Sequence, residues 1–414
     1  MTGADGYLEV EEQLRRVLSR TPVLAAETVA LDDAAGRTLG GDAPARSAVP
    51  PFDNSAMDGF AVRFADVAAA TAEAPVTLRV VADIPAGSGA DPSLAPGTAA
   101  RIMTGAPVPA DADAIVPFED TAGGLADSLS TAVVRRAPRG PGAHIRRAGE
   151  DIAAGATVLA PGVPLGPRQL AALAAAGIAE VPVAPRPRVV VVSTGSELVA
   201  PGSALQRGQI PESNGILLAG LVAEAGAEPV ARRVVDDEGD GPAEVVAEAA
   251  RLGAHAVIFS GGVSAGAYEV VRESLGASMD FVKVAMQPGK PQGFGSSAEG
   301  MLLFGLPGNP VAVAVSFEAF VRPALLRMQG RTEIHRRRRL LPAGVAWRTP
   351  AGRRQYLPVV VDDADPARPV VRPATAGGSG SHLAVGLGAA GGYAVVPAEV
   401  EAVRAGDLVE VIEF

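Results

Sequence analysis

The sequence of 414 residues contains no cysteine. This absence excludes disulfide bonds, thiolate zinc sites and a cysteine nucleophile. Histidine is scarce as well, and its four occurrences are far apart in the chain: His144, His255, His335 and His382. Without a pair at helical spacing, a histidine-based zinc site is disfavoured.

Lysine is the next scarcity. Only Lys283 and Lys290 occur among 36 basic residues, so arginine serves at every other cationic position. The two lysines lie close together, which indicates a place where a compact ammonium fits and a broad guanidinium does not. The alternative is a compositional preference for arginine with a chance pairing of the two lysines.

Positive charge is also lacking overall, because the formal net charge is −10. Nucleic acid is therefore not expected as a partner, since a phosphate backbone requires a basic face. The basic run "HRRRRL" at residues 335–340 is interpreted as a solvated stretch at a domain junction.

Long apolar runs free of charge are absent too. The longest helical candidate, "NPVAVAVSFEAFVRPALLRM", contains Glu318, Arg322 and Pro323 and predicts a core helix, with no membrane association. The start "MTGADGYLEV" lacks the basic and apolar regions of a signal peptide. We expect a soluble, cytoplasmic protein.

The patterns that are present change along the chain. Residues 8–20 have apolar residues at helical spacing, and residues 21–140 form short β-like runs broken by proline and glycine. After a proline-rich hinge, "PVAPRPR", apolar strands alternate with helices for about 140 residues, which is typical of a doubly wound parallel sheet. From residue 331 onward, short strands separated by turns predict a small β barrel.

Polar and glycine residues follow the predicted strands of the α/β region. In such a sheet, ligands bind beyond the carboxyl ends of the strands. The residues at these ends are Ser193, Thr194, Gly195 and Glu197; Asp236 and Asp237; Gly261, Gly262, Ser264 and Glu269; and Pro307, Gly308, Asn309 and Pro310. Taken singly they read as tight turns and helix caps, but the topology places all four segments on one rim.

The rim combines two kinds of group. Backbone N–H groups and hydroxyls there suit a phosphate or another oxyanion. The carboxylates would repel that anion, and a divalent cation relieves the repulsion, so we predict Mg²⁺ on oxygen ligands. Ordinary loop carboxylates paired with arginine are the alternative.

A dense polar loop, "PPFDNSAMDGFAV", occupies residues 51–63. Asp53, Asn54 and Ser55 are turn formers, and Asp58-Gly59 is a second turn signal. Local turns alone explain such residues, although their density exceeds what a turn needs.

Seven segments occur in a specific order: "FDNSAMDGFAV", "RIMTGAPVP", "RRAGEDI", "STGSEL", "SGGVSAG", "QPGKPQGFG" and "GLPGNPV". With them the sequence resembles the molybdopterin molybdenumtransferases, which are the molybdenum insertases called MoeA in bacteria and are related to the gephyrin E domain. The resemblance implies insertion of molybdate into adenylylated molybdopterin, with Mg²⁺-dependent hydrolysis of the pyrophosphate bond and release of AMP.

The resemblance also implies four domains and an elongated homodimer. The predicted domains are an elongated linker and dimerisation domain (1–48 and 141–182), a mostly β domain (49–140), a MogA-like α/β molybdopterin-binding domain (183–330) and the C-terminal β barrel (331–414). Molybdopterin adenylyltransferase and molybdoenzyme chaperones are its implied protein partners.

Roles for individual residues follow from the matched motifs and the lysine pair. The predicted catalytic residues are Asp58, Thr104, Asp151, Glu197, Asp236, Glu269, Lys283 and Lys290, with Asp58 facing the α/β domain of a partner subunit. The predicted substrate-binding residues are Ser193, Thr194, Gly195, Gly261, Gly262, Ser264, Pro307, Gly308, Asn309, Pro310, Arg353 and Ser381. The predicted metal ligands are Glu197, Asp236 and Glu269.

Three positions depart from the family pattern. Glu269 stands where aspartate is usual, "TGSE" replaces the frequent "TGDE", and Gln287 stands where many members carry a second lysine. The last departure lowers the positive charge expected around molybdate.

Two other functions remain open at this stage. One is a different enzyme on the same α/β domain, either the adenylyltransferase or a nucleotide amidohydrolase related to competence-damage proteins. The other is a non-catalytic scaffold, which would need a peptide groove and a fused partner domain that these residues do not supply.

Overall fold

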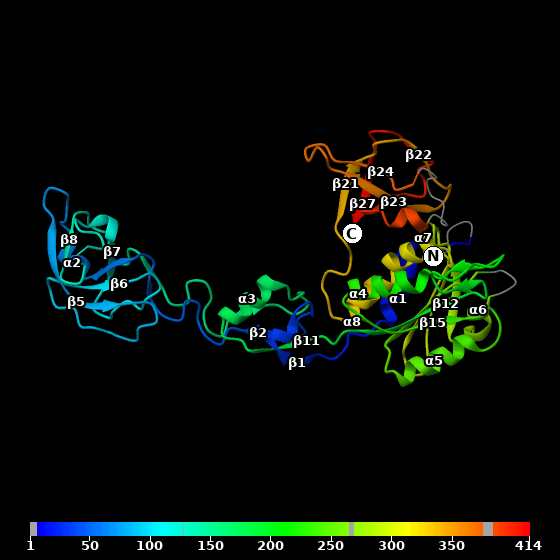
Figure 1. The fold of residues 1–414 in the computed structure, drawn as a ribbon, viewed down its shortest axis with the longest axis horizontal. Coiled ribbons are helices and arrows are strands. Elements are labelled where there is room, and N and C mark those ends of the chain that lie inside the picture. Colours follow the sequence, from blue (N-terminus) through cyan, green and yellow to red (C-terminus); the bar gives the residue numbers. More distant parts are fainter. Residues whose placement is uncertain (1–5, 127, 265–268, 376–383) are drawn as a thin grey trace.

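The computed structural model describes residues 6–126, 128–264, 269–375 and 384–414. The molecule is elongated: a β domain lies at one end, a slender linker in the middle, and the α/β and C-terminal domains together at the other end (Figure 1). The described part of the chain contains no helix that is both long and apolar enough to cross a membrane.

The distal β domain is built on a five-stranded sheet in the order β7-β4-β6-β5-β8. Alternate residues of β4 enter separate apolar clusters, Phe60 and Val62 on one face and Ala61 on the other. Each face is therefore buried, as the apolar run of β4 predicts. Its elements are β3 (Asn54–Ser55), β4 (Gly59–Val62), α2 (Phe64–Val67), β5 (Val76–Ile84), β6 (Thr98–Ile102), β7 (Ala114–Pro117), η2 (Phe118–Asp120), β8 (Thr131–Val134) and β9 (Ile145–Arg146).

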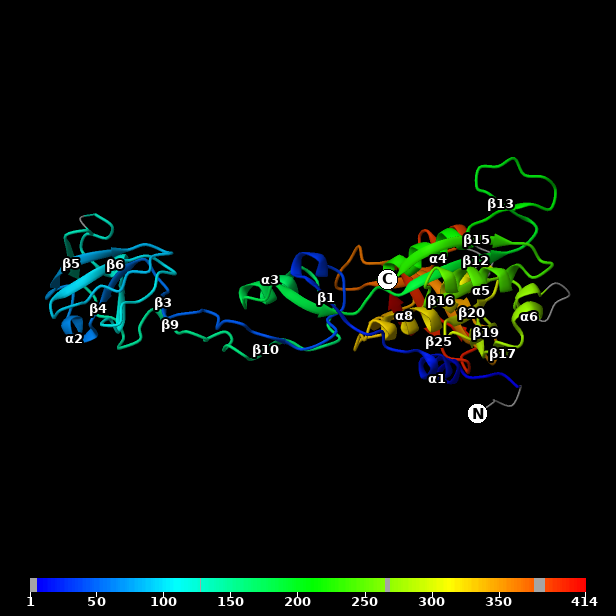
Figure 2. The same cartoon turned by 90° about the horizontal axis from the view of Figure 1, so that it is seen from below.

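The linker consists of two short antiparallel pairs and one helix. Strand β1 pairs with β11, β2 pairs with β10, and α3 packs beside them over a small apolar cluster (Figure 2). Helix α3 begins with Pro167 and is followed by Gly177 at φ +77°, as its sequence predicts. The elements are β1 (Glu27–Ala30), η1 (Leu31–Ala34), β2 (Ala43–Pro44), β10 (Thr157–Leu159), α3 (Pro167–Ala175) and β11 (Glu180–Val183).

The α/β domain has a six-stranded sheet in the order β15-β12-β16-β20-β19-β17. Four strands are parallel, as predicted, whereas β19 and β17 add an antiparallel edge. Its strands are β12 (Arg188–Thr194), β13 (Leu198–Val199), β14 (Ile210–Pro211), β15 (Glu228–Val235), β16 (Ala256–Ser260), β17 (Met279–Lys283), β18 (Met286–Gln287), β19 (Pro291–Ser296) and β20 (Leu302–Leu306).

Helices cover both faces of this sheet. Val189 and Val191 of β12 point into one core, with the helices α4, α7 and α8, and Val190 and Val192 point into the other, with α5 and α6. This alternation confirms the doubly wound arrangement. The helical elements are α4 (Asn214–Glu224), α5 (Gly241–Arg251), α6 (Val270–Leu275), α7 (Pro310–Ser316), the π-helical turn η3 (Phe317–Val321) and α8 (Arg322–Met328).

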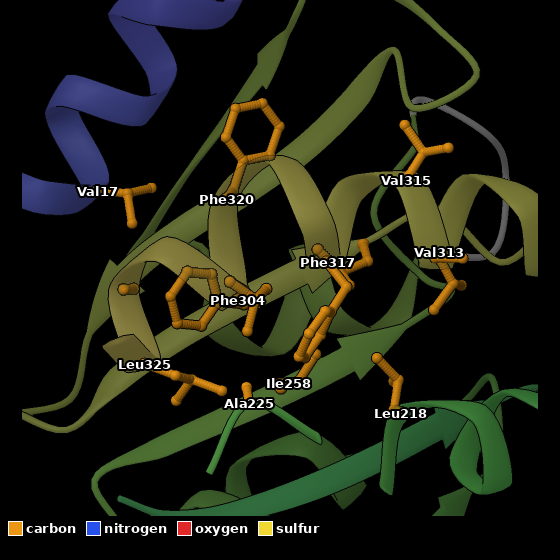
Figure 3. Close-up of a cluster of buried hydrophobic side chains, with 14 of the residues drawn as sticks. Val17, Leu218, Ala225, Ile258, Phe304, Val313, Val315, Phe317, Phe320 and Leu325 are labelled. Carbon is orange, nitrogen blue, oxygen red and sulfur yellow. The ribbon is translucent and has the colours of Figure 1, made fainter. Parts of the chain in front are cut away.

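Helix α1 (Val10–Arg20) has the predicted amphipathic character. Val10 and Val17 are buried in the α/β core beside Phe320 and Leu325, and Figure 3 shows Val17 facing this cluster. The helix therefore packs on the α/β domain and not in the linker, because its apolar stripe finds its large apolar partner surface there.

The C-terminal domain is rich in strands, which run in the order β18-β23-β25-β27-β21, with β24 beside β23. Strand β18 comes from the α/β domain, so one sheet joins the two domains. The elements are β21 (Arg338–Pro342), β22 (Trp347–Arg348), β23 (Arg354–Asp362), β24 (Val370–Pro373), α9 (Ala384–Leu387), β25 (Gly392–Val396), β26 (Ala402–Val403) and β27 (Leu408–Glu413).

Candidate functional site

A cavity of about 520 Å³ opens at the carboxyl ends of the parallel strands, where the α/β domain meets the C-terminal domain. We call it the rim pocket. Nine of the predicted site residues line it: Thr194, Glu197, Ser264, Lys290, Pro307, Gly308, Asn309, Pro310 and Arg353. The topological argument therefore gathers segments that are distant in the sequence around one space.

Close approach of the loops explains one glycine of this rim. Gly261 has φ +98°, and a Cβ atom there would lie 2.4 Å from Thr194 Oγ1. The Gly261 N–H donates to the carbonyl of Leu306 at 2.9 Å. A larger residue would separate the ends of β12, β16 and β20, so glycine keeps these three loops together.

Ser193 lies behind the pocket wall and not on it. Its hydroxyl donates to Glu212 Oε1 at 2.8 Å, and the same oxygen accepts the Gly215 N–H at 2.6 Å. Glu212 itself is buried and lines the pocket, and Asn214 beside it donates to the Gly308 carbonyl at 2.7 Å. Glu212 and Asn214 were not predicted, although "ESN" directly before a helix was a readable signal.

Hydrogen bonds from a buried side chain and from the backbone fix the turn that carries Lys290. Gln292 is buried, and its side-chain amide donates to the Gly289 carbonyl at 2.7 Å and to Ser316 Oγ at 2.8 Å. The Val284 N–H donates to the Lys290 carbonyl at 2.7 Å. Lys290 thus lines the pocket from a fixed backbone.

Lys283 does not line the rim pocket. It lines a neighbouring cavity of about 640 Å³ together with Arg16, Arg272 and Lys290. Strand pairing places Lys283 opposite Pro291, so the two lysines are neighbours across the β17–β19 hairpin. Of the pair, Lys290 alone borders both spaces.

The three predicted metal ligands do not form a set. Glu197 lines the pocket, Glu269 accepts the Ser264 N–H at 2.6 Å, and it is Asp237, not Asp236, that accepts the Ser196 N–H at 3.0 Å. Within the described ranges no group of three or more histidine, aspartate or glutamate side chains is placed to hold a metal ion. Of the three predicted ligands, Glu197 is the one that lines the rim pocket.

The loop at residues 51–63 lies in the distal β domain, far from the rim pocket in this chain (Figure 1). Asp58 Oδ1 accepts the Thr104 N–H at 2.6 Å and the Thr104 hydroxyl at 2.8 Å. These two hydrogen bonds, the backbone one first, hold the pKa of Asp58 below its usual range. Thr104 therefore holds the Asp58 carboxylate in one orientation and favours its ionised form, and both residues are exposed.

Asp53 anchors the same loop to the chain that returns toward the linker. Its carboxylate accepts the Ala148 N–H at 2.8 Å and pairs with Arg147 at 2.5 Å, and these contacts lower its pKa. The density of polar residues in the loop 51–63 thus has a local cause, since the carboxylates of Asp53 and Asp58 each accept hydrogen bonds from a neighbouring turn. Asp151 is exposed in the segment between β9 and β10 that leads to the linker.

Ten described residues of the predicted site lie off the wall of the rim pocket, and one further residue, Ser381, lies outside the described residues. The ten are Asp58, Thr104, Asp151, Ser193, Gly195, Asp236, Gly261, Gly262, Glu269 and Lys283.

Three family models match the chain in order. They are described as the MoeA N-terminal region (domain I and II), over residues 8–177; a probable molybdopterin binding domain, over residues 190–327; and the MoeA C-terminal region (domain IV), over residues 341–414. The first match spans the distal domain and the linker and also includes α1, the second lies in the α/β domain, and the third lies in the C-terminal domain.

Similar proteins cover almost the whole length. Molybdopterin molybdenumtransferase 2 of Mycobacterium tuberculosis is 45% identical over 97% of this chain and 98% of its own length. Molybdopterin molybdenumtransferase 1 of the same organism is 35% identical over 97% and 98%. The crystal structure of the molybdopterin biosynthesis MoeA protein from Pyrococcus horikoshii OT3 has a TM-score of 0.83 at 28% identity and covers 99% of this chain and 100% of its own. The chain therefore belongs to the molybdopterin molybdenumtransferase family, the MoeA-type transferases of molybdenum cofactor biosynthesis.

Proposed function

We propose that this chain inserts molybdate into adenylylated molybdopterin, with hydrolysis of the pyrophosphate bond and release of AMP. The observation that carries the proposal is the rim pocket, where the loops after β12, β16 and β20 meet the two cationic residues Lys290 and Arg353. The substrates it would bring together, a nucleotide-linked pterin phosphate and an oxometalate, are both anions. The names of the relatives agree with this substrate class.

The residues of the pocket divide into two roles. Lys290 and Arg353 would bind the oxygens of molybdate by charge-assisted hydrogen bonds. Thr194, Ser264 and the backbone of the Gly308 turn would orient the phosphates of the nucleotide. Because these groups are fixed by the fold before substrate arrives, they stabilise developing negative charge without reorganisation.

Magnesium enters the proposal through Glu197. Mg²⁺ in phosphate-transfer sites is commonly held by one or two carboxylates together with substrate phosphates and water. Glu197 on the pocket wall can supply one of them, whereas Glu212, the other carboxylate of the wall, already accepts hydrogen bonds from Ser193 and Gly215. When bound, the ion would neutralise phosphate charge and polarise the pyrophosphate. We expect Mg²⁺ to strengthen AMP binding to the wild type and to have a much smaller effect on Glu197→Gln.

A homodimer completes the proposal. Asp58 and Thr104 lie at the opposite end of the molecule from the rim pocket, so one chain cannot bring them to it (Figure 1). In a symmetric dimer each distal domain can face the pocket of the other chain. The linker (141–182, with the strands of 21–48) would then set the distance that the distal domain must span.

The direct test is AMP release. Purified protein is incubated with adenylylated molybdopterin, Mg²⁺ and molybdate, and AMP is quantified against reactions that lack molybdate or protein. We expect AMP release that depends on molybdate. Folded protein that releases no AMP above the blank contradicts the proposed function.

A further inference from the structure

Arg353 and Gln287 make a side-chain contact at the seam between the α/β and C-terminal domains. Arg353 Nη1 donates to Gln287 Oε1 at 2.7 Å, and both residues line the rim pocket. Arg353 is the cation that the C-terminal domain adds to this pocket, so its position decides whether the pocket has one or two positive charges.

The contact with Gln287 is what holds this guanidinium. Arg353 immediately precedes β23, where successive side chains point to opposite sides: the next residue, Arg354, turns away to pair with Glu11 on α1. Within the described part of the chain, Arg353 forms no ion pair with any carboxylate. A long, half-buried arginine without such a partner loses much rotamer freedom when fixed, and one strong hydrogen bond offsets that cost.

Gln287 is itself held by its backbone. It belongs to β18, which pairs in parallel with β23 across the domain boundary. The Arg354 N–H donates to the Ala285 carbonyl at 3.0 Å, and Ala285 donates to the Leu8 carbonyl at 2.9 Å. The backbone position of Gln287 is therefore fixed, and its side-chain Oε1 holds Arg353 in turn.

The charge state of the acceptor matters for an anion pocket. A neutral amide leaves the positive charge of Arg353 intact, whereas a carboxylate at the same place would neutralise it. Arg353 and Lys290 then present two positive charges beside the carboxylates of Glu197 and Glu212, and these two cations offset the two negative charges of a tetrahedral dianion such as molybdate.

We infer that Gln287 is a positioning residue: by holding the uncompensated guanidinium of Arg353 at the seam, it sets the affinity of the rim pocket for the oxyanion substrate. The inference rests on the proposed function, because it takes molybdate as that substrate. It assigns Gln287 no contact with the reacting atoms.

The test is a double-mutant cycle on binding of inorganic molybdate, measured by isothermal titration calorimetry on the full chain. Gln287→Ala should weaken binding about tenfold, the usual scale for a hydrogen bond to a charged group. Arg353→Ala should weaken it at least as much, and adding Gln287→Ala to Arg353→Ala should cause no further loss, because one residue acts through the other. Gln287→Glu should bind molybdate more weakly than Gln287→Ala, since the carboxylate cancels the charge of Arg353.

Catalysis supplies a second readout that a structural defect would not reproduce. In AMP release, Gln287→Ala should raise the KM for molybdate and leave kcat within about twofold, because uniform binding is lost and no transition-state contact is. Thermal melting of all variants identifies any that fail to fold.

The outcomes separate the two proposals. A folded wild type that binds no molybdate contradicts the proposed function and this inference together. If the wild type binds molybdate but the affinity losses of the two single variants add up in the double variant, this inference alone is contradicted. The same holds if Gln287→Glu binds molybdate as tightly as the wild type does.

Discussion

The rim pocket and the loop around Asp58 differ in what their charged groups already contact. In the pocket, Lys290 and Arg353 have no carboxylate partner within the described residues, so their charge is available to a ligand. In the distal loop, Asp58 and Asp53 are satisfied by N–H groups, a hydroxyl and Arg147.

This difference has a physical meaning. The pocket is prepared to bind an anion by itself, because its cations would gain charge-assisted hydrogen bonds. The distal loop is prepared to present a carboxylate of fixed direction and charge, but an exposed loop does not by itself enclose a substrate. The second region needs another molecule to become part of a site, and the predictions below test that comparison in order of decreasing effect.

The largest expected effect comes from disabling each region in turn. Lys290→Ala and Asp58→Ala should each lower molybdate-dependent AMP release by about 10²- to 10³-fold, the scale for loss of one fixed charged group. If the two regions meet across a symmetric dimer, mixing and re-annealing both inactive variants should restore about a quarter of the wild-type rate, since half of the dimers then contain one intact site of two.

The matched control mixes Asp58→Ala with a Thr104→Ala, Asp58→Ala double variant, and no activity should return. An equally inactive mixture of Lys290→Ala and Asp58→Ala, with exchange of subunits shown by mass spectrometry, would contradict a site shared between chains.

The next prediction tests whether the distal β domain and the α/β domain, which have separate apolar cores, also unfold separately. Leu78 is buried in the distal β domain and Leu325 in the α/β core, and no apolar cluster joins the two. Truncation of either to alanine should cost about 3 kcal/mol of local stability. Because cooperativity requires shared packing, Leu78→Ala should lower only the unfolding transition of the distal domain.

Two probes distinguish the halves. Trp347 is the only tryptophan and lies in the C-terminal domain, so its fluorescence follows that half of the molecule. Hydrogen exchange of peptides from residues 59–134 follows the other half. If Leu78→Ala shifts the Trp347 transition as much as Leu325→Ala does, the two regions unfold as one unit and the comparison is wrong.

The sequence predicted the rim pocket better than its details. Parallel strands bring their carboxyl ends to one edge, so the segments at Thr194, Ser264 and Gly308 could be placed together from order alone. The family resemblance is confirmed by its relatives, and the doubly wound sheet by its two cores.

What sequence reasoning missed depends on contacts between distant residues. Strand β19 is not among the strands that the sequence predicted, and a Cβ on its Gly295 would lie 1.9 Å from the carbonyl oxygen of Ser278. Glycine is needed there to let two strands approach, and no local pattern reveals it. The contact of Gln287 with Arg353 and the docking of α1 on the α/β core likewise join segments that only the folded chain brings together.

A smaller effect is expected at the junction that fixes the pocket end of the molecule. The buried Arg336 pairs with Glu318 at 3.0 Å and also with Glu224, between the C-terminal domain and the α/β helices. Arg336→Ala should cost about 2 kcal/mol, less than is usual for breaking a buried pair, because Glu318 keeps Arg322 as a second partner at 3.7 Å. Arg339→Ala, which breaks an exposed pair with Glu413, should cost about 0.5 kcal/mol or less.

The pH dependence of the Arg336→Ala effect follows from Glu318. Burial raises the pKa of Glu318, and Arg322 and Arg336 oppose that rise. Removing Arg336 raises it further, and a raised carboxyl pKa means that stability is lost as the pH rises from 4.5 through the folded value. The deficit of Arg336→Ala in chemical denaturation should therefore grow from pH 4 to pH 7. A deficit that is constant or shrinks over this range would show that Glu318 is not the group involved.

The smallest expected effect is the pH dependence of the stability that Asp58 contributes. Its pKa is lowered by the hydrogen bonds from Thr104, so the folded distal domain gains stability from the ionised form above the usual value of 3.8 and loses it as the pH falls through the folded value. Asp58→Asn should therefore be less stable than the wild type at pH 6, and the gap should narrow as the pH falls below 3.8, measured by denaturant unfolding of the distal domain. Asp151→Asn is the matched control, because in the described structure the Asp151 carboxylate accepts no hydrogen bond, and it should show no such gap. If the stability difference between Asp58→Asn and the wild type at pH 6 persists unchanged at pH 3, Asp58 acts by its shape and not by its charge. The contrast between the charged groups of the distal loop and those of the rim pocket would then be wrong.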